Sequence, residues 1–188
     1  ITNNKIPTFK KDENARFIET EIRINKIKKR IKLICIYLPN GNPIDSKKFI
    51  YKIEWMKKFN DYIKELYNKN NPIIIGGDFN VIPTDDDVYE PKNFKDDACA
   101  HPETRKIFRS LINIGFNDLV KDFINGKTNW TYWGYRGGGW QKGNGLRIDH
   151  FLTTSELTDK IKKVEIDRVP RSLEKASDHT PVIIELFN

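Results

Sequence analysis

Residues 73–80 read Ile-Ile-Ile-Gly-Gly-Asp-Phe-Asn, an apolar run that leads directly into polar residues. A short run that is apolar on both faces is typical of a central strand covered on two sides. Asp78 and Asn80 lie two residues apart, so at a strand end they project to the same side. Gly76 and Gly77 allow a backbone or a substrate to come close. Such a pair suits a water or a phosphate oxygen, although an Asp and an Asn after a strand more often form a turn.

Strands and helices alternate on both sides of this stretch. Apolar residues recur every three or four positions over residues 46–67, which predicts a helix with Asp45 or Ser46 as its N-cap. A second helix is expected from Pro102 to its end at Gly115. Further strands are expected at residues 19–25, 33–38, 146–153, 163–169 and 180–186, and a long loop at residues 82–100.

The first of these strands alternates, with Ile22 on one side and Glu19 and Glu21 on the other, as a half-buried strand does. A basic stretch separates it from the strand at 33–38. A solvated hairpin explains this stretch better than a DNA-binding patch does. Its residues are Lys26, Lys28, Lys29, Arg30 and Lys32.

The composition indicates one globular domain over residues 1–188, because 38% of the residues are hydrophobic and 31% are charged. The net charge of +7 favours partners that carry phosphate, although a Lys-, Asn- and Ile-rich bias explains part of it. Apolar runs are too short to span a bilayer and no amino-terminal signal is visible, so no membrane partner and a cytoplasmic location are expected. The two thiols, Cys35 and Cys99, indicate buried or half-buried residues rather than a disulfide.

Two further motifs place polar residues beside strands. In Arg147-Ile148-Asp149-His150, alternation turns Arg147 and Asp149 to one face, and the carboxylate is equally explained by chemistry or by a salt bridge. In Ser177-Asp178-His179-Thr180-Pro181, a carboxylate and an imidazole precede a strand, which suits a metal site beside a base, with a capping turn as the alternative.

A third feature is Tyr37, whose phenol lies at the end of the strand at 33–38. It either bonds a phosphate oxygen or, as the more frequent case, faces the core.

Taken in order, these motifs resemble the exonuclease III branch of the endonuclease/exonuclease/phosphatase superfamily. The motifs are Tyr-x-Pro-Asn-Gly at 37–41, Gly-Asp-Phe-Asn at 77–80, Leu-Arg-Ile-Asp-His at 146–150 and Ser-Asp-His-Thr-Pro at 177–181. The resemblance extends from about Ala15 to the last strand. It implies an α+β fold, the α/β four-layer sandwich, in which two packed mixed β-sheets are flanked by helices. It also implies that the first strands of the domain are lacking here.

The resemblance also implies roles for the catalytic residues. Asp78 corresponds to the carboxylate that orients or deprotonates the attacking water, and Asn80 to the amide that holds the phosphate. Tyr37 corresponds to the phenol that contacts the scissile phosphate. Asp149 corresponds to the carboxylate that orients the histidine, and His179 to that histidine, which bonds a phosphate oxygen.

Metal and DNA contacts follow from the same resemblance. Asp178, with Asp78 and Asn80, corresponds to the site for Mg²⁺, with Mn²⁺ as an alternative. Tyr132 resembles the aromatic wall of the abasic-sugar pocket. Contacts with DNA are expected from Tyr132, Trp140, Arg147 and His179.

The implied function is a Mg²⁺-dependent DNA repair phosphodiesterase of the bacterial cytoplasm and nucleoid, an abasic-site (AP) endonuclease that cuts 5′ to abasic sites. Its partner is double-stranded DNA with abasic sites or 3′ ends, and the complete enzyme, a monomer, also has 3′-to-5′ exonuclease and 3′-end trimming activity. An amino-terminal Asn and a metal-binding Glu typical of the family are not in this sequence, so weak or no activity is expected of the chain alone. The alternatives are an inactive nucleic-acid-binding fragment or another nuclease or phosphatase of the superfamily.

Overall fold

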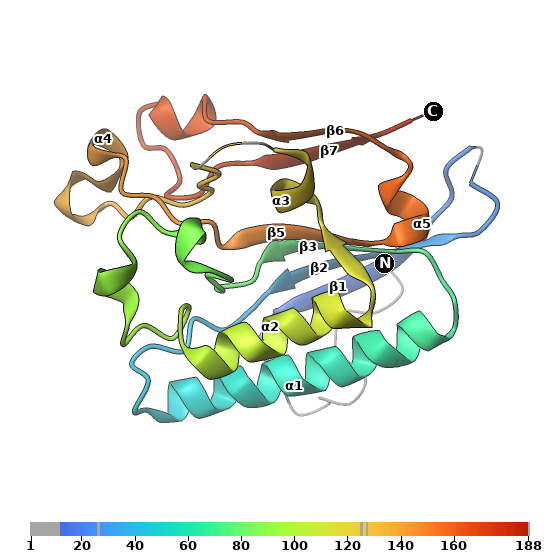
Figure 1. Cartoon of the computed structure of the whole chain (residues 1–188), viewed down its shortest axis with the longest axis horizontal. Coiled ribbons are helices and arrows are strands. Elements are labelled where there is room, and N and C mark those ends of the chain that lie inside the picture. Colours follow the sequence, from blue (N-terminus) through green and yellow to red (C-terminus); the bar gives the residue numbers. More distant parts are fainter. Residues whose placement is uncertain (1–11, 26, 125, 127, 188) are drawn as a thin grey trace.

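The computed structural model describes residues 12–25, 27–124, 126 and 128–187. Two β-sheets form its centre (Figure 1). The strands are β1 (Phe17–Ile22), β2 (Ile31–Tyr37), β3 (Ile73–Asp78), β4 (Phe116–Asp118), β5 (Asp149–Thr154), β6 (Ile161–Ile166) and β7 (Val182–Leu186). The α-helices are α1 (Lys47–Asn68), α2 (Pro102–Ile114), α3 (Leu119–Phe123), α4 (Gly139–Lys142) and α5 (Ser155–Thr158). Short 3-10 turns are η1 (Asp85–Asp87), η2 (Pro91–Phe94), η3 (Arg136–Gly138) and η4 (Pro170–Ser172). Helices α1 and α2 pack against the larger sheet, and α3 contacts strands of both sheets (Figure 1).

The larger sheet is mixed and has the order β1-β2-β3-β5-β4. Strands β2 and β3 are parallel, while the other neighbours are antiparallel. The smaller sheet pairs β6 with β7 and lies on the face of the larger sheet opposite α1 and α2 (Figure 1). The predicted class, two packed sheets flanked by helices, is therefore confirmed, but within the described residues the second sheet is a two-stranded antiparallel one rather than mixed.

Strand β3 is the doubly covered central strand that its isoleucines predict. Ile73 and Ile75 pack into the main core under α1 and α2, and Ile74 packs into a smaller cluster on the other face. The predicted helix at 46–67 forms as α1, with the Ser46 side chain accepting from the backbone N–H of Lys48. Gly115 ends α2 with a φ of 125°, as its position predicts.

The first strand differs from its expected orientation. Glu19 is only 5% exposed and accepts a hydrogen bond of 2.5 Å from the Tyr62 hydroxyl on α1. The face turned away from α1 carries Ile18, which is 41% exposed, and its register partner Cys35, which is also exposed. The expectation of a buried or half-buried Cys35 was wrong, because Cys35 is exposed.

Each face of β1 is buried over part of the strand. Phe17 and Glu19 are buried toward α1, but Glu21 on the same side is exposed. Ile22 on the other side is partly buried in the cluster of Ile31, Ile74 and Leu157.

The basic stretch joins β1 to β2 as a hairpin, as predicted. Lys29 pairs with Glu156, and Arg30 pairs with Glu21. Lys26 lies outside the described residues. No helix in the described part of the chain is both long and apolar enough to cross a membrane.

Candidate active site

Strands β2 and β3 end, and the antiparallel strand β5 begins, at one edge of the larger sheet, where three polar side chains come together. In register, Tyr37 of β2 pairs with Asp78 of β3, and Asp78 pairs with Asp149 of β5. Residues that are paired across adjacent strands project to the same face of a sheet. The strand register therefore aligns these three residues in one row at the sheet edge.

Asp78 and Asn80 form a turn that also fixes the Asp78 carboxylate. The backbone N–H of Asn80 donates to Asp78 Oδ1 at 2.8 Å, and Asn80 Nδ2 donates to Asp78 Oδ2 at 3.0 Å and to the Leu38 carbonyl at 2.9 Å. Asn80 is 5% exposed and has a φ of 47°. The turn expected for such a pair is present, and it holds the carboxylate in place.

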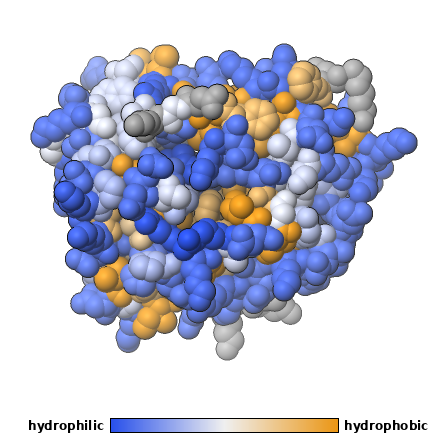
Figure 2. Space-filling model, viewed as in Figure 1, coloured by the Kyte–Doolittle hydropathy of each residue, from blue (hydrophilic) through white to orange (hydrophobic). Residues whose placement is uncertain are grey.

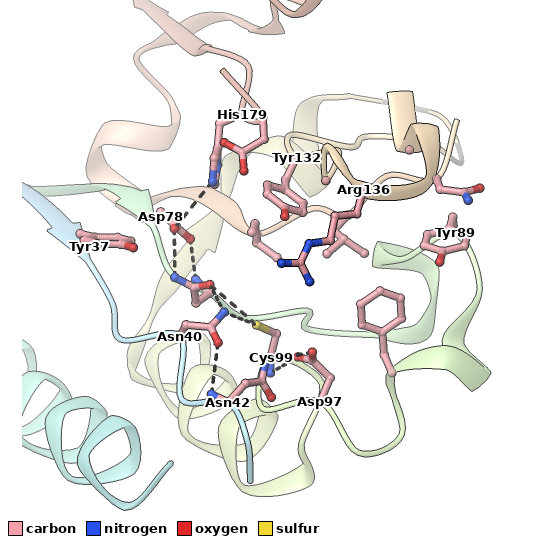
Figure 3. Close-up of a pocket in the computed structure, with 18 residues that line it drawn as sticks. Tyr37, Asn40, Asn42, Asp78, Tyr89, Asp97, Cys99, Tyr132, Arg136 and His179 are labelled. Carbon is pink, nitrogen blue, oxygen red and sulfur yellow. Dashed lines mark hydrogen bonds and ion pairs between the residues drawn. The ribbon is translucent and has the colours of Figure 1, made fainter. Parts of the chain in front are cut away.

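His179 lies above this row, between the carboxylates of Asp149 and Asp78. Figure 3 shows His179 next to Asp78, with a dashed line between them. Its Nδ1 is 2.9 Å from Asp149 Oδ2, and its Nε2 is 4.0 Å from Asp78 Oδ2. Burial alone would lower the pKa of His179, but the hydrogen bond and the charge of Asp149 outweigh it and raise that pKa above its ordinary value. Burial, together with the charge of Asp149, raises the pKa of Asp78 to about 6.

Backbone hydrogen bonds hold the segment that carries His179. Trp133 N donates to the Asp178 carbonyl at 2.8 Å, and Thr180 N donates to the Thr131 carbonyl at 2.8 Å. The Tyr132 ring packs edge-on against the His179 imidazole, with ring centroids 4.9 Å apart. The aromatic segment at 130–140 is thus tied to the histidine.

These residues surround one cavity of about 500 Å³. Six of the residues predicted from the sequence line it: Tyr37, Asp78, Asn80, Tyr132, Asp178 and His179. Asp149 lies behind His179 and touches it. Residues that the sequence did not point to also line the cavity: Asn40, Asn42, Tyr89, Phe94, Asp97, Cys99, Arg136 and Asn144.

Asn40 and Asn42 come from the loop after β2. Asn40 Nδ2 donates to Asn80 Oδ1 at 3.1 Å, and Asn42 Nδ2 donates to Asp97 Oδ2 at 3.0 Å. The Asn42 side chain also accepts from Ala98 N at 2.9 Å. The Pro-Asn-Gly signal marked a strand end, but nothing local indicated that its amides cross-link two distant loops.

Lys52 is an unexpected buried cation beneath the cavity. It belongs to the inner face of α1 and is fully buried. Its ammonium donates to the Asn80 carbonyl at 2.6 Å and to the Asn40 carbonyl at 3.0 Å. Burial lowers the pKa of Lys52. The helix thus ties together the loops that follow β2 and β3.

The prediction that Arg147 contacts DNA needs correction. Arg147 is 1% exposed and binds Asp87 and Asp118, each at 2.7 Å, and its Nη1 is 2.9 Å from His150 Nδ1. Regular alternation begins only at Asp149, where β5 starts, so Arg147 does not share the face of Asp149. The salt-bridge alternative concerned Asp149, and the partner of that carboxylate is His179 rather than Arg147. The carboxylates that bind Arg147 come from η1 and from the end of β4.

Trp140 does not line the cavity. Its ring packs against Trp133, with ring centroids 4.8 Å apart, and the Arg171 guanidinium lies 5.5 Å from the ring centroid. Packing therefore accounts for this partly buried residue, and its contact with DNA stays a prediction.

Comparison with known proteins places the chain in a family. The model of the Endonuclease/Exonuclease/phosphatase family matches residues 3–179. The chain belongs to this family. Exodeoxyribonuclease III of Haemophilus influenzae is 30% identical over 193 residues, covering 95% of this chain and 69% of that protein. A DNA-(apurinic or apyrimidinic site) endonuclease of Dictyostelium discoideum is 35% identical over 152 residues, covering 80% of this chain and 41% of that protein.

A solved structure agrees with the family assignment. A 3′ phosphatase from Neisseria, bound to a product DNA hairpin, superposes with a TM-score of 0.91 at 28% identity. The superposition covers 98% of this chain and 70% of that chain. The chain thus spans about two fifths to seven tenths of these relatives' lengths.

The donor groups present could supply only part of the coordination of a divalent cation, and waters or substrate would have to supply the rest. Among the described residues there is no group of three or more His, Cys, Asp or Glu side chains placed to hold a metal. Asp178 and Asp78 line the cavity, with the Asn80 amide beside them. Mg²⁺ keeps several waters and takes one or two carboxylates plus substrate phosphate. This donor set matches that preference in kind.

Proposed function

We propose that the cavity binds the DNA backbone and that the protein is an AP endonuclease-type phosphodiesterase that cuts 5′ to abasic sites in double-stranded DNA. The arrangement of Asp78, Asp149 and His179 carries this proposal. A carboxylate with a pKa of about 6 lies 4.0 Å from an imidazole whose pKa is raised, and both line an open polar cavity. Such a pair suits the activation of a water and the binding of an anionic oxygen.

In this proposal Asp78 is ionised at neutral pH and its Oδ atoms orient or deprotonate the attacking water. The Nε2–H of His179 bonds a non-bridging phosphate oxygen, while Asp149 holds Nδ1–H and stabilises the cation, as an orienting acid does in a triad. The Tyr37 phenol, on a residue that is 53% exposed at the cavity rim, contacts the scissile phosphate. Asn80, which the resemblance assigns to the phosphate, donates both Nδ2 hydrogens to Asp78 and Leu38, so its role in this proposal is to fix the Asp78 carboxylate. Tyr132 forms one wall of the sugar pocket.

Mg²⁺, with Mn²⁺ as an alternative, is the proposed cofactor, held by Asp178 with Asp78 and Asn80. When bound, it would neutralise charge on the phosphate oxygens. One or two carboxylates bind Mg²⁺ weakly without further ligands. We therefore expect weak activity of the chain alone.

The complete enzyme is proposed to have 3′-to-5′ exonuclease and 3′-end trimming activity as well. The similarity to a Neisseria protein named a 3′ phosphatase specifically favours the trimming activity as a second function. A bacterial cytoplasmic location at the nucleoid is the corresponding proposal for where the enzyme acts.

Single-turnover incision of a duplex with one abasic-site analogue tests the proposal. The wild-type chain is compared with Asp78→Asn, each with Mg²⁺ and with EDTA, beside an intact duplex and a duplex with a 3′-phosphate. We expect slow cutting 5′ to the lesion that EDTA and the substitution both abolish. Cutting that is insensitive to Asp78→Asn, or that is equal on intact duplex, would contradict the proposal.

A further inference from the structure

The charge of the cavity lining does not match an anionic substrate. Among the described residues that line it are three aspartates, Asp78, Asp97 and Asp178. Arg136 is the only lysine or arginine in that lining. A DNA strand brings one negative charge per nucleotide, so a cation beside the phosphates matters for affinity.

Arg136 also differs from the arginines near it. Arg147 is held by two carboxylates, and Arg171 donates to the Trp133 carbonyl at 3.0 Å. Arg16 lies over the Tyr37 ring and donates to the Tyr37 carbonyl at 3.2 Å. Arg136 is exposed, and within the described part of the chain its guanidinium has no hydrogen-bond or ion-pair partner. Its five donors are therefore available to a ligand.

The turn that carries Arg136 is held by contacts of Tyr135 and Gly139, while Gly137 within it has open space around it. The Tyr135 hydroxyl donates to the Ala176 carbonyl at 2.9 Å, just before the Asp178–His179 segment. Gly139 packs so closely that an added Cβ would lie 2.6 Å from the Gly134 carbonyl oxygen. Gly137, in contrast, has a φ of 70° and nothing within 4 Å of such a Cβ. The backbone on either side of Arg136 is therefore held close to the segment that carries His179. Around Gly137, the next residue, there is open space.

Figure 3 shows the Arg136 side chain reaching from this turn into the cavity, beside Tyr132 and toward the space that Asp78 and His179 border. A cavity of about 500 Å³ lies within the range of about 300–1,000 Å³ typical of sites for ligands larger than one phosphate group. There is room for a second backbone phosphate next to the one at His179.

Building on the proposed function, we propose that Arg136 forms a second phosphate subsite, which binds the DNA backbone phosphate adjacent to the scissile one. The planar guanidinium fork matches two oxygens of a phosphate. The subsite would set the register of the strand over Asp78 and His179. Arg136 is in this sense a substrate-binding residue and takes no part in proton transfer.

The test is the salt dependence of binding to a fluorescein-labelled duplex with an abasic-site analogue, measured by anisotropy in EDTA so that no turnover occurs. The variants are Arg136→Gln, Arg136→Lys and, as a control of equal charge change, Arg109→Gln on the exposed surface of α2. Arg136→Gln should weaken binding on the order of 10-fold at low salt. It should also make the plot of the logarithm of the association constant against the logarithm of the salt concentration less steep by about 0.9. Arg136→Lys should keep the slope and lose part of the affinity, and Arg109→Gln should match wild type.

Thermal unfolding of Arg136→Gln should match wild type, because the side chain is exposed and partner-free. If the wild-type chain binds the duplex but Arg136→Gln leaves the slope unchanged, or Arg109→Gln changes it equally, the subsite is overturned and the proposed function stands. If the wild-type chain does not bind the abasic duplex at all, both proposals fail.

Discussion

Asp78 and His179 illustrate how the strand ends set the chemistry of single residues. Asp78 is held by two hydrogen bonds from Asn80 and lies near Asp149, while His179 takes its orientation from Asp149. Burial and the negative charge of Asp149 disfavour the ionised form of Asp78, so the ionised carboxylate destabilises the folded state. A group that is costly to the fold and central to a cavity is typical of a functional site.

Asp78→Asn should therefore stabilise the protein at neutral pH. The pKa of Asp78 rises from 3.8 in the unfolded chain to about 6 in the fold, so its ionisation opposes folding as pH rises between these values. In EDTA, the unfolding free energy of the variant should exceed that of wild type by about 1–3 kcal/mol at pH 7. This gain should shrink as pH falls through 6 and vanish below about 4. Urea denaturation across this range measures it, and a difference independent of pH would contradict the assignment.

Asp149→Asn should lower the pKa of His179, because the substitution removes the hydrogen bond and the charge that raise it. An NMR titration of the imidazole resonances measures this change. The His150 ring, which contacts Arg147 and the Val81 carbonyl instead, serves as the internal control. An unchanged titration of His179 would show that Asp149 is not its partner in solution.

The site depends on the pairing of β2 with β3. Gly77 has a φ of 138°, and a Cβ there would lie 2.0 Å from the Ile36 carbonyl oxygen. Gly77→Ala should therefore destabilise the protein by about 3 kcal/mol or more, whereas Gly143→Ala, at a φ of 69° in open space, should cost about 1–2 kcal/mol. Equal losses in urea denaturation would contradict the close approach of these strands.

The periodicity of apolar residues predicts where helices and strands lie better than it predicts which residues contact one another across the fold. The apolar stripe at 46–67 marks α1 to within one residue at each end, because an amphipathic helix shows its buried face in its own sequence. Lys52, on that buried face, could not be predicted, since its partners are carbonyls from two loops that come near only in the fold. The three-residue strand β4 is too short to leave a periodic signal.

The same limit applies to the candidate site. Tyr37, Asp78, Asn80 and His179 could be proposed because strand-end position is visible in the sequence. The buried pairing of Arg147 with Asp87 and Asp118 could not, because it joins residues 60 and 29 positions apart. Arg136 lies within the aromatic segment at 130–140 and has no periodic signal of its own, so only the fold shows that it lines the cavity.

Several large hydrophobic side chains are exposed on the surface of the molecule. The face of β1 and β2 turned away from α1 exposes Ile18 and Cys35, and β7 exposes Ile183, which is 45% accessible. Figure 2 shows one face of the molecule as mainly hydrophilic, with separate hydrophobic patches. Exposed apolar patches favour association with other surfaces.

Ile18→Lys combined with Ile183→Lys should reduce any self-association of the chain at high concentration. Because both positions are exposed, each substitution should change the unfolding free energy by no more than about 0.5 kcal/mol. Sedimentation velocity over a range of concentrations measures the first effect, and urea denaturation the second. Self-association that persists unchanged in the folded double variant would show that another surface is responsible.

If the cavity beside Tyr37, Asp78 and Asp149 binds a DNA phosphate, the imidazole resonances of His179 should respond to that phosphate. These resonances are followed by NMR while a duplex with an abasic-site analogue is added in EDTA, beside an intact duplex. We expect a saturable change in the His179 resonances that the intact duplex does not produce at the same concentration. Binding of the abasic duplex that leaves the His179 resonances unchanged would contradict it.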